Sequence, residues 1–565
     1  MDRFWLKSYP AGVPENVDVN KYSSVVALLE ESFAKYRDDK AYICMDKALT
    51  FGEVDALSAA LGAYLQSLGL KKGDRVAIMM PNLLQYPVAV AAVLRAGFIV
   101  VNVNPLYTPR ELAHQLKDSG AQAIIILENF AATLGEVIAD TPIRHVILAA
   151  VGDLLGFPKG TIVNFVLRNV KKAIPAYSLP GAIRFNTALA RGRHVVLAKP
   201  EITPDDVAVL QYTGGTTGVS KGATLLHRTL IGNLLASEAW TQPGLKRKPI
   251  EGQPVFICAL PLYHVFAFVS CALLAMRMGG VNVLIPNPRD LGGMIKELAK
   301  YRFNVMPGVN TLFNGLANHP DFAKLDFSHL LIANGGGMAV QEAVAKKWLA
   351  LTGCPIVEGY GLSETSAGVT CNPTDSSAYT GTIGLPLPNV EIRMLDDDGK
   401  DVPRGAAGEI AIRGPQVMAG YWQRPDETAN VMTPDGFFKS GDVGIMDERG
   451  YITIIDRKKD MILVSGFNVY PNEIEGVAVS HPGVLECAVV GVPDRNSGEA
   501  VMMFVVRKDP NLTKEELMKF CMENLTGYKK PKYIEFRTDL PRTNVGKILR
   551  RELRDQAIKD MTKAA

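Results

Sequence analysis

Hydrophobic and polar positions follow two periods over the first 450 residues. Apolar residues at helical spacing predict helices at 107–119 and 341–351. Short, continuous apolar runs at 123–127, 145–149 and 281–285 predict buried strands. Because helices and strands alternate, we expect an α/β fold with stacked, largely parallel sheets in a large N-terminal domain.

The pattern changes at about Gly384. Short alternating runs at 390–395 and 408–413 predict strands, and the turn residues 397–399 lie between them. We therefore expect a small β-rich subdomain at the end of the large domain.

A charged run at 456–460 follows a predicted strand at 451–455. The remainder predicts a helix from about Pro471, a helix at 514–523, and strands at 486–491, 500–507 and 533–537. About 100 residues are enough for a separate α+β domain. We therefore divide the chain into domains 1–456 and 457–565.

Composition excludes several classes of protein. The 565 residues are 47% hydrophobic and 21% charged with a net charge of +3, so neither disorder nor a general attraction to nucleic acid is expected. Seven scattered cysteines without a CxxC pair argue against zinc and indicate a reducing, cytoplasmic location. The apolar stretch 83–103 is interrupted by Arg95 and predicts a buried helix and strand, whereas 265–276 is too short to span a bilayer. The N-terminus does not resemble a signal peptide, so we do not expect export.

The segment 212–222, Tyr-Thr-Gly-Gly-Thr-Thr-Gly-Val-Ser-Lys-Gly, carries the first candidate chemistry. An apolar strand at 207–210 precedes it, and we expect a helix to begin near Leu225. Closely spaced glycines let backbone N–H groups converge on an anion, while threonine hydroxyls and a lysine add donors and charge. The segment is not a GxxxxGK[ST] loop, because Gly222 follows the lysine. The candidate phosphate-binding residues are Thr213, Gly214, Gly215, Thr216, Thr217, Gly218 and Lys221.

This loop resembles the phosphate loop of the acyl-adenylate-forming superfamily, which includes acyl-CoA synthetases, luciferases and peptide-synthetase adenylation domains. Six further motifs follow in the superfamily's order: Leu260-Pro-Leu-Tyr-His-Val-Phe266, Glu358-Gly-Tyr-Gly-Leu-Ser-Glu364-Thr, Gly408-Glu-Ile-Ala-Ile-Arg-Gly414, Lys439-Ser-Gly-Asp442, Asp456-Arg-Lys-Lys-Asp460 and Pro541-Arg-Thr-Asn-Val-Gly-Lys547. The resemblance implies ATP-dependent activation of a carboxylic acid by domain 1–456, with 457–565 as a mobile lid.

The resemblance also implies a nucleotide and metal site. Thr216 and Glu364 would hold Mg²⁺, which prefers one or two carboxylates together with substrate phosphates. Tyr360 would stack on adenine, and Asp442, with Arg457 as its partner, would accept both ribose hydroxyls. The other implied ATP-binding residues are Gly336, Gly337, Glu358, Gly359, Gly361, Ser363 and Lys459, the last at the hinge.

The implied catalytic residues are Lys547, Lys221, Glu364 and His264. By resemblance, Lys547 bridges the substrate carboxylate and the α-phosphate. Both reactants are anions, so cations are needed where they approach. His264 would line the junction of the substrate channels, although a histidine in this apolar, aromatic setting is as often a packed polar residue.

The acyl pocket is expected to be apolar, with His264, Val265, Phe268, Met306, Gly308 and Gly335 as lining residues. Residues 264–280 contain no Asp or Glu, which disfavours an amino acid as substrate. An aliphatic acid is favoured, because each buried methylene contributes about 0.8 kcal/mol. The stretch 435–466 also resembles the signature of long-chain fatty acyl-CoA synthetases, bacterial ones above all. A medium-chain or aryl acid:CoA ligase, a luciferase and a non-catalytic ATP- or lipid-binding protein are the alternatives.

Coenzyme A is the acceptor that the resemblance implies, with Ser465, Gly466 and Phe467 presented to its channel. Lys529, Lys530 and Lys532 could meet its 3′-phosphate, but three surface lysines are more often only solvated. Residues 161–175 could form an amphipathic helix facing a membrane, although packing against the core is the commoner arrangement. Peripheral contact with the inner face of a membrane and a homodimer therefore stay open.

Overall fold

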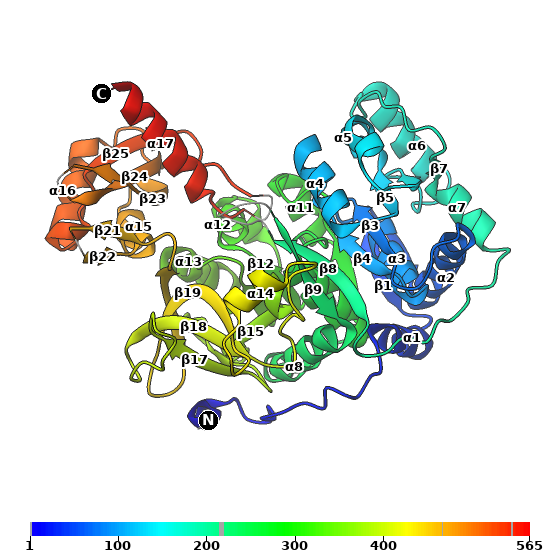
Figure 1. Ribbon diagram of the computed structural model, residues 1–565, viewed down its shortest axis with the longest axis horizontal. Helices are drawn as coiled ribbons and strands as arrows, with labels where there is room; N and C mark the ends of the chain where they lie inside the picture. Colours follow the sequence, from blue (N-terminus) through cyan, green and yellow to red (C-terminus); the bar gives the residue numbers. More distant parts are fainter. Residues whose placement is uncertain (1–2, 214–219, 466, 496, 544–545, 565) are drawn as a thin grey trace.

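The computed structural model describes residues 3–213, 220–465, 467–495, 497–543 and 546–564. Its described strands form four sheets, and helices cover the two larger ones (Figure 1). The predicted α/β fold is confirmed.

A seven-stranded sheet lies in the N-terminal part, in the order β7-β6-β5-β3-β4-β8-β9. All its neighbours are parallel except β8 and β9. Its strands are β3 (Arg75–Met79), β4 (Ile99–Asn102), β5 (Ala123–Leu127), β6 (His145–Ala149), β7 (Ile183–Arg184), β8 (Val207–Thr213) and β9 (Lys221–Leu226).

A nine-stranded sheet follows the order β16-β15-β14-β13-β12-β10-β11-β1-β2, with antiparallel pairs only near its two edges. Its strands are β1 (Lys40–Cys44), β2 (Lys47–Thr50), β10 (Val255–Cys258), β11 (Val281–Leu284), β12 (Val305–Gly308), β13 (Ile332–Gly335), β14 (Ile356–Leu362), β15 (Ala367–Cys371) and β16 (Leu385–Pro386).

Helices join and cover these two sheets. They are α1 (Val25–Lys35), α2 (Phe51–Ser67), α3 (Gln85–Arg95), α4 (Pro109–Ser119), α5 (Ala131–Val137), α6 (Lys159–Phe165), α7 (Phe185–Gly192), α8 (His227–Leu245), α9 (Val265–Ala267), α10 (Leu274–Arg277), α11 (Leu291–Leu298), α12 (Asn310–Asn318) and α13 (Glu342–Thr352). The predicted helix and strand within 83–103 are α3 and β4, both buried. The guanidinium of Arg95 pairs with Asp55 at 2.9 Å, which lets an arginine end a buried helix.

The β-rich subdomain is a four-stranded antiparallel sheet, β17 (Glu391–Leu395), β18 (Ala407–Arg413), β19 (Phe438–Met446) and β20 (Ile452–Arg457), with α14 (Pro425–Val431) beside it. We expected a strand to end at residue 455, but β20 continues to Arg457. Pairing with β19 sustains it, because Asp442 lies opposite Arg457.

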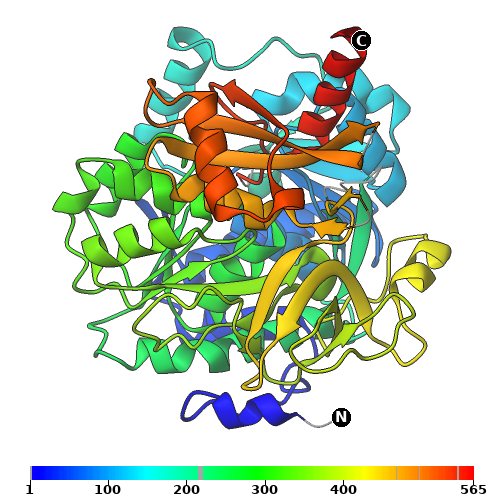
Figure 2. The same ribbon diagram turned by 90° about the vertical axis from the view of Figure 1, so that its left-hand side faces the viewer.

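The C-terminal residues form a separate sheet, seen in front of the rest of the molecule in Figure 2. It contains β21 (Ile462–Val464), β22 (Phe467–Val469), β23 (Val484–Asp494), β24 (Gly498–Arg507) and β25 (Tyr533–Arg537), with α15 (Pro471–Ser480), α16 (Lys514–Asn524) and α17 (Arg550–Ala564). The sheet has a hydrophobic cluster on each face. The division at 456/457 stays a prediction.

The helix expected near Leu225 is α8, but the strand that precedes it was not predicted. Residues 221–226 form β9, antiparallel to β8, and α8 begins only at His227. A six-residue run with buried Ala223, Leu225 and Leu226 completes the sheet edge, so the phosphate-loop candidates join two strands. Among the described residues, no helix has the length and apolar character needed to cross a membrane.

Candidate active site

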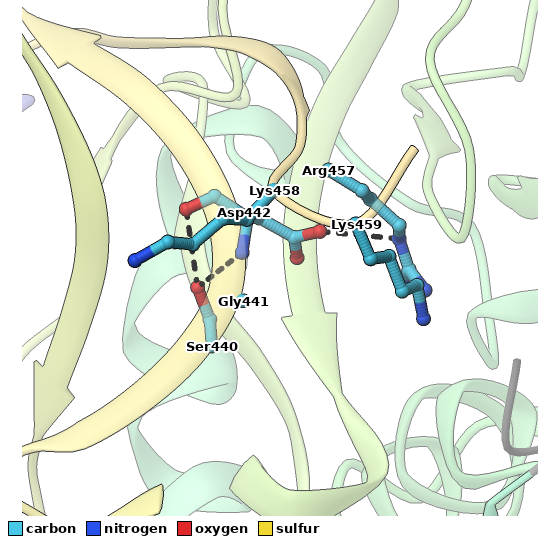
Figure 3. A pocket seen from close by; sticks show the side chains of 6 residues that line it. All are labelled: Ser440, Gly441, Asp442, Arg457, Lys458 and Lys459. Atoms are coloured by element: carbon cyan, nitrogen blue, oxygen red, sulfur yellow. Dashed lines mark hydrogen bonds and ion pairs between the residues drawn. The ribbon is translucent and has the colours of Figure 1, made fainter. Parts of the chain in front are cut away.

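A cavity of about 270 Å³ lies where the β-rich sheet leads into the C-terminal domain. Figure 3 shows its lining residues, which come from β19 and from the end of β20 and the turn beyond it. They are Ser440, Gly441, Asp442, Arg457, Lys458 and Lys459. One acid and three bases thus meet at the predicted nucleotide site.

Asp442 is the centre of this site. Its side chain is buried, one oxygen lies 3.1 Å from Nε of Arg457, and the other accepts a 2.6 Å hydrogen bond from the Tyr360 hydroxyl. Burial and the neighbouring carboxylate raise the pKa of Tyr360 well above its ordinary value, so the phenol stays protonated and donates. Two donors from different sheets therefore fix an oxygen acceptor at the cavity wall.

Local backbone geometry orients Asp442. Gly441 has φ +74°, which a glycine adopts without strain, and the Ser440 hydroxyl accepts from the Asp442 N–H at 3.1 Å. The Ser-Gly-Asp sequence thus turns the carboxylate toward Arg457.

Glycines on β14 and beside β13 let backbone segments approach closely. A Cβ on Gly361 would lie 1.7 Å from the carbonyl oxygen of Ala367, and one on Gly336 would lie 3.1 Å from the ring of Phe266. Gly337 has φ +75°, while Gly359 packs near the carbonyl of Thr370. At Gly361, Gly336 and Gly359 a side chain would force neighbouring atoms to move, whereas at Gly337 the positive φ disfavours one.

Glu358 holds the loop after β13. Its buried carboxylate accepts a 2.8 Å hydrogen bond from the Val340 N–H, and burial raises its pKa to about 7. The Glu358 side chain therefore binds the protein backbone and holds the loop beside the other candidate nucleotide-binding residues.

Glu364 and Lys221 meet through a residue that sequence reasoning missed. The Tyr421 hydroxyl donates to Glu364 at 2.9 Å, and Nζ of Lys221 lies 4.9 Å from the centre of the Tyr421 ring. Lys221 also forms an ion pair with Glu427. Tyr421 is 57 residues from Glu364, so no local spacing could have linked them.

Ser363 begins the short 3-10 turn that carries Glu364. Burial raises the pKa of Glu364. The backbone carbonyl of the same residue accepts from the Met418 N–H at 2.7 Å, which ties the turn to the segment leading to Tyr421.

Lys547 reaches the large domain from the C-terminal one. A Cβ on the preceding Gly546, whose φ is +81°, would lie 2.5 Å from Oγ1 of Thr311 in α12. Burial and the nearby Arg457 lower the pKa of Lys547 to about 7. Burial and the charge of Lys547 lower the pKa of His264 to about 4, which leaves His264 neutral.

The acyl-pocket candidates lie in the interior of the large domain. Val265, Phe268 and Met306 are buried, and Phe268 begins a π-helix, Phe268–Leu273. Gly308 and Gly335 are register partners on β12 and β13. His264 caps α9, whose residues Val265 and Ala267 are buried.

Two of the coenzyme A candidates, Ser465 and Phe467, belong to the β21–β22 part of the C-terminal domain, which lies away from α12 in Figure 1. Ser465 has φ +51° and donates its N–H to the Ser497 carbonyl, and the exposed ring of Phe467 stacks on Tyr528 at 4.6 Å. Lys529 and Lys532 pair with Glu473 and Asp494.

Several predicted residues lie outside the described part of the chain. These are Gly214, Gly215, Thr216, Thr217, Gly218 and Gly466. Thr213 is described and pairs with Lys221 across the β8–β9 hairpin.

Within the described ranges, no group of three or more His, Cys, Asp or Glu is arranged to hold a metal ion. Glu364 by itself offers one carboxylate. Such a donor fits Mg²⁺ that takes its other ligands from phosphate and water.

Comparisons with known proteins agree with this fold. The model of the family described as AMP-binding enzyme matches residues 29–422, and that of the AMP-binding enzyme C-terminal domain matches 473–547. The chain therefore belongs to the AMP-binding enzyme family.

Individual relatives narrow the class. The chain is 55% identical over 558 residues to the long-chain-fatty-acid–CoA ligase of Escherichia coli O6:H1 and 56% identical over 560 residues to that of Yersinia pestis. Both alignments cover 99% of each protein. Among solved structures, ATP-bound MatB from Rhodopseudomonas palustris aligns with a TM-score of 0.81 and 29% identity, covering 95% of this chain and 99% of that one.

Proposed function

We propose that this protein is an AMP-forming long-chain fatty acid:CoA ligase. In the first step, a carboxylate oxygen of the acid attacks the α-phosphorus of ATP and pyrophosphate leaves, giving acyl-AMP. In the second, the sulfur of coenzyme A loses its proton, attacks the acyl carbon and displaces AMP. The substrate class is supported by two ligases of this kind, which align with 99% of this chain and are 55% and 56% identical to it in sequence.

One observation above all supports adenylation: Lys547 from the C-terminal domain faces the cleft of the large domain. An ammonium about 4 Å from a unit negative charge gains roughly 4 kcal/mol at an effective dielectric of about 20. If the transition state feels most of that gain, the rate rises several hundredfold. Lys547 would lie between the acid and the α-phosphate and offset their repulsion.

The other charged residues would position ATP. Asp442, fixed by Arg457 and Tyr360, would accept the ribose hydroxyls, while Lys221 would exchange Glu427 for the terminal phosphates. Thr216 and Glu364 would hold Mg²⁺, which when bound neutralises phosphate charge. Lys459 would mark the hinge for a rotation that withdraws Lys547 and turns Ser465, Gly466 and Phe467 toward coenzyme A.

A substrate panel tests the assignment. Purified protein with ATP, Mg²⁺ and coenzyme A is given saturated acids from octanoate to stearate, together with benzoate and coumarate, and acyl-CoA and AMP are measured. We expect palmitate to give the highest kcat/KM and AMP to equal thioester. A maximum at octanoate or at an aryl acid would replace the proposal with a medium-chain or aryl ligase.

The two half-reactions test the role of Lys547. Lys547→Ala should slow pyrophosphate release several hundredfold and change thioester formation from supplied acyl-AMP only a few fold. Equal losses in both steps would contradict the role, and no acid-dependent pyrophosphate release from the unaltered protein would leave only a binding function. We place the reaction in the cytoplasm, with peripheral contact at a membrane.

A further inference from the structure

Residues 154–200 have an unusual charge. They contain eight Lys and Arg and no Asp or Glu, although the whole chain carries 58 acidic residues and a net charge of only +3. The stretch includes α6, β7 and α7, which lie together along one side of the molecule (Figure 1). The stretch itself therefore carries only positive formal charge.

The same stretch exposes apolar side chains. Of the eleven large hydrophobic residues that are prominently exposed in the described part of the chain, six lie between 157 and 196. Phe157 is 90% exposed, Ile162 57%, Phe165 59% and Val170 66%. Exposed phenylalanine side chains beside lysines that lack acidic partners are unfavourable in water, so such a patch usually marks a surface that a membrane or another protein covers.

Polar contacts hold this segment with its apolar side chains outward. α6 continues into a π-helix, Val166–Val170, whose Arg168 donates to the buried carboxylate of Glu128 at 2.8 and 3.0 Å. The Asn164 side chain accepts from the Gly152 N–H at 2.8 Å, and Lys159 pairs with Asp46 at 3.2 Å. The anchors face the protein, so the rings of Phe157 and Phe165 are left at the surface.

Four basic residues here have no ion pair within the described ranges. Lys171 and Lys172 follow the π-helix, Arg191 lies in the last turn of α7 and Arg193 directly follows that helix, and all four are exposed. The start of α7 is tied to the same region, because Asn186 donates to the Asp153 carbonyl at 3.1 Å. Apolar side chains flanked by free cations match the interface of an anionic bilayer, where rings enter the headgroup region and lysines meet phosphates.

We propose that residues 157–172 are a docking surface for a membrane containing anionic phospholipids. Its purpose rests on the proposed function, since a long-chain acid dissolves in the bilayer from which this surface would receive it. The surface lies in the large domain, so docking leaves the C-terminal domain free.

Vesicle co-sedimentation tests the surface. The full-length protein is mixed with phosphatidylcholine vesicles with or without phosphatidylglycerol. We expect at least about tenfold stronger partition onto the anionic vesicles, reduced by salt. F157S/I162S/F165S should lose most binding to both, and K171E/K172E should lose the anionic preference.

Matched controls lie far from this surface. M522S/L485S also replaces exposed apolar residues, and K346E/K347E reverses two adjacent exposed lysines of α13. Both should bind vesicles as the unaltered protein does. Phe157→Ser, at the most exposed position, replaces the triple variant if that variant does not fold.

Equal binding by surface and control variants would overturn the proposal, as would absence of binding by the unaltered protein. A change of oligomeric state in F157S/I162S/F165S without a change in vesicle binding would assign the surface to a second copy instead. Octanoate ligation without vesicles should be unchanged in all variants. If the unaltered protein did not ligate octanoate, the proposed function would be contradicted, but the vesicle-binding result would still test the docking surface.

Discussion

Lys547 and Asp442 carry opposite charges in the same site. The neighbours of Asp442 hold it in place, whereas the neighbours of Lys547 lower its pKa. Asp442 keeps two donors, Arg457 and Tyr360, which hold it in place as an acceptor. Lys547 is close to Arg457 and partly removed from water, and its pKa falls to about 7. In the free protein, the lysine is therefore half charged near neutral pH.

This shift predicts a pH profile for adenylation. Because the ammonium form is the useful one, kcat/KM should fall about tenfold per unit as pH rises above 7. Lys547→Arg should abolish that alkaline limb, since a guanidinium stays charged. Initial rates of pyrophosphate release measure both profiles, and an unchanged limb in the arginine variant would assign the titration to another group.

Tyr421 is predicted to position Glu364. Removing its hydroxyl in Tyr421→Phe deletes a hydrogen bond to a carboxylate while keeping the ring under Lys221, and should raise the half-saturating Mg²⁺ concentration about fivefold to tenfold.

Tyr421→Leu also removes the ring and should raise the KM for ATP in addition. Thermal unfolding of both variants serves as the control for folding. Unaltered Mg²⁺ dependence in Tyr421→Phe would refute the positioning role.

Arg550, the first residue of helix α17, lies close to three carboxylates near the start of the C-terminal domain. Arg550 lies 3.6 Å from Asp456, 3.5 Å from Asp460 and 2.7 Å from Glu475. Burial raises the pKa of Asp456 to about 6, even though Arg550 acts in the opposite direction. Three carboxylates thus share one guanidinium where the two domains join.

Removing this guanidinium should loosen α17. Arg550→Ala leaves the carboxylates to repel one another, and we expect about 3 kcal/mol less protection of α17 and α15 in hydrogen exchange, with the sheets of the large domain unaffected.

Arg554→Ala on the same helix removes a single, more exposed pair with Glu499 and should cost less than about 1 kcal/mol. Similar losses in the two variants would mean that Arg550 is an ordinary surface arginine.

Sequence periodicity correctly located those strands and helices whose flanking residues differ from them in polarity. β5, β6 and β25 have the predicted bounds, and β5 shows why, because Gln122 and Glu128 flank its continuous apolar run. β9 was not predicted, because its leucines run directly into α8 and the local pattern does not reveal its pairing with β8. Local pattern carries no information on which strand completes an edge.

Candidate residues were located by their motifs, but their contacts were not. Asp442 and Arg457 belong to recognised motifs and lie together. Tyr421 and Glu427 reach Glu364 and Lys221 only because the chain returns to the sheet edge after β18, where Ala223 bridges to Tyr421.

At the scale of the whole molecule, Gly546 is a position at which the C-terminal domain lies against the large domain. Its contact with Thr311 leaves no room for a side chain, and its φ disfavours one.

Gly546→Ala should therefore keep the C-terminal domain from seating. We expect adenylation to fall at least about tenfold while thioester formation from supplied acyl-AMP is retained. Gly527→Ala, at a position where an added Cβ meets nothing within 4 Å, should leave both steps unchanged. Loss of both steps in Gly546→Ala would indicate misfolding rather than blocked seating.

β20 ends at Arg457, and Lys459 follows only two residues later. Arg457 is part of a sheet of the large domain, whereas Lys459 and Lys547 would travel with the lid. If the lid rotates as proposed, the nucleotide pocket keeps Arg457 and Lys221 but gives up two cations together. The electrostatic potential that retains a polyanion would then drop in one movement, which would turn a site that traps ATP into one that releases AMP.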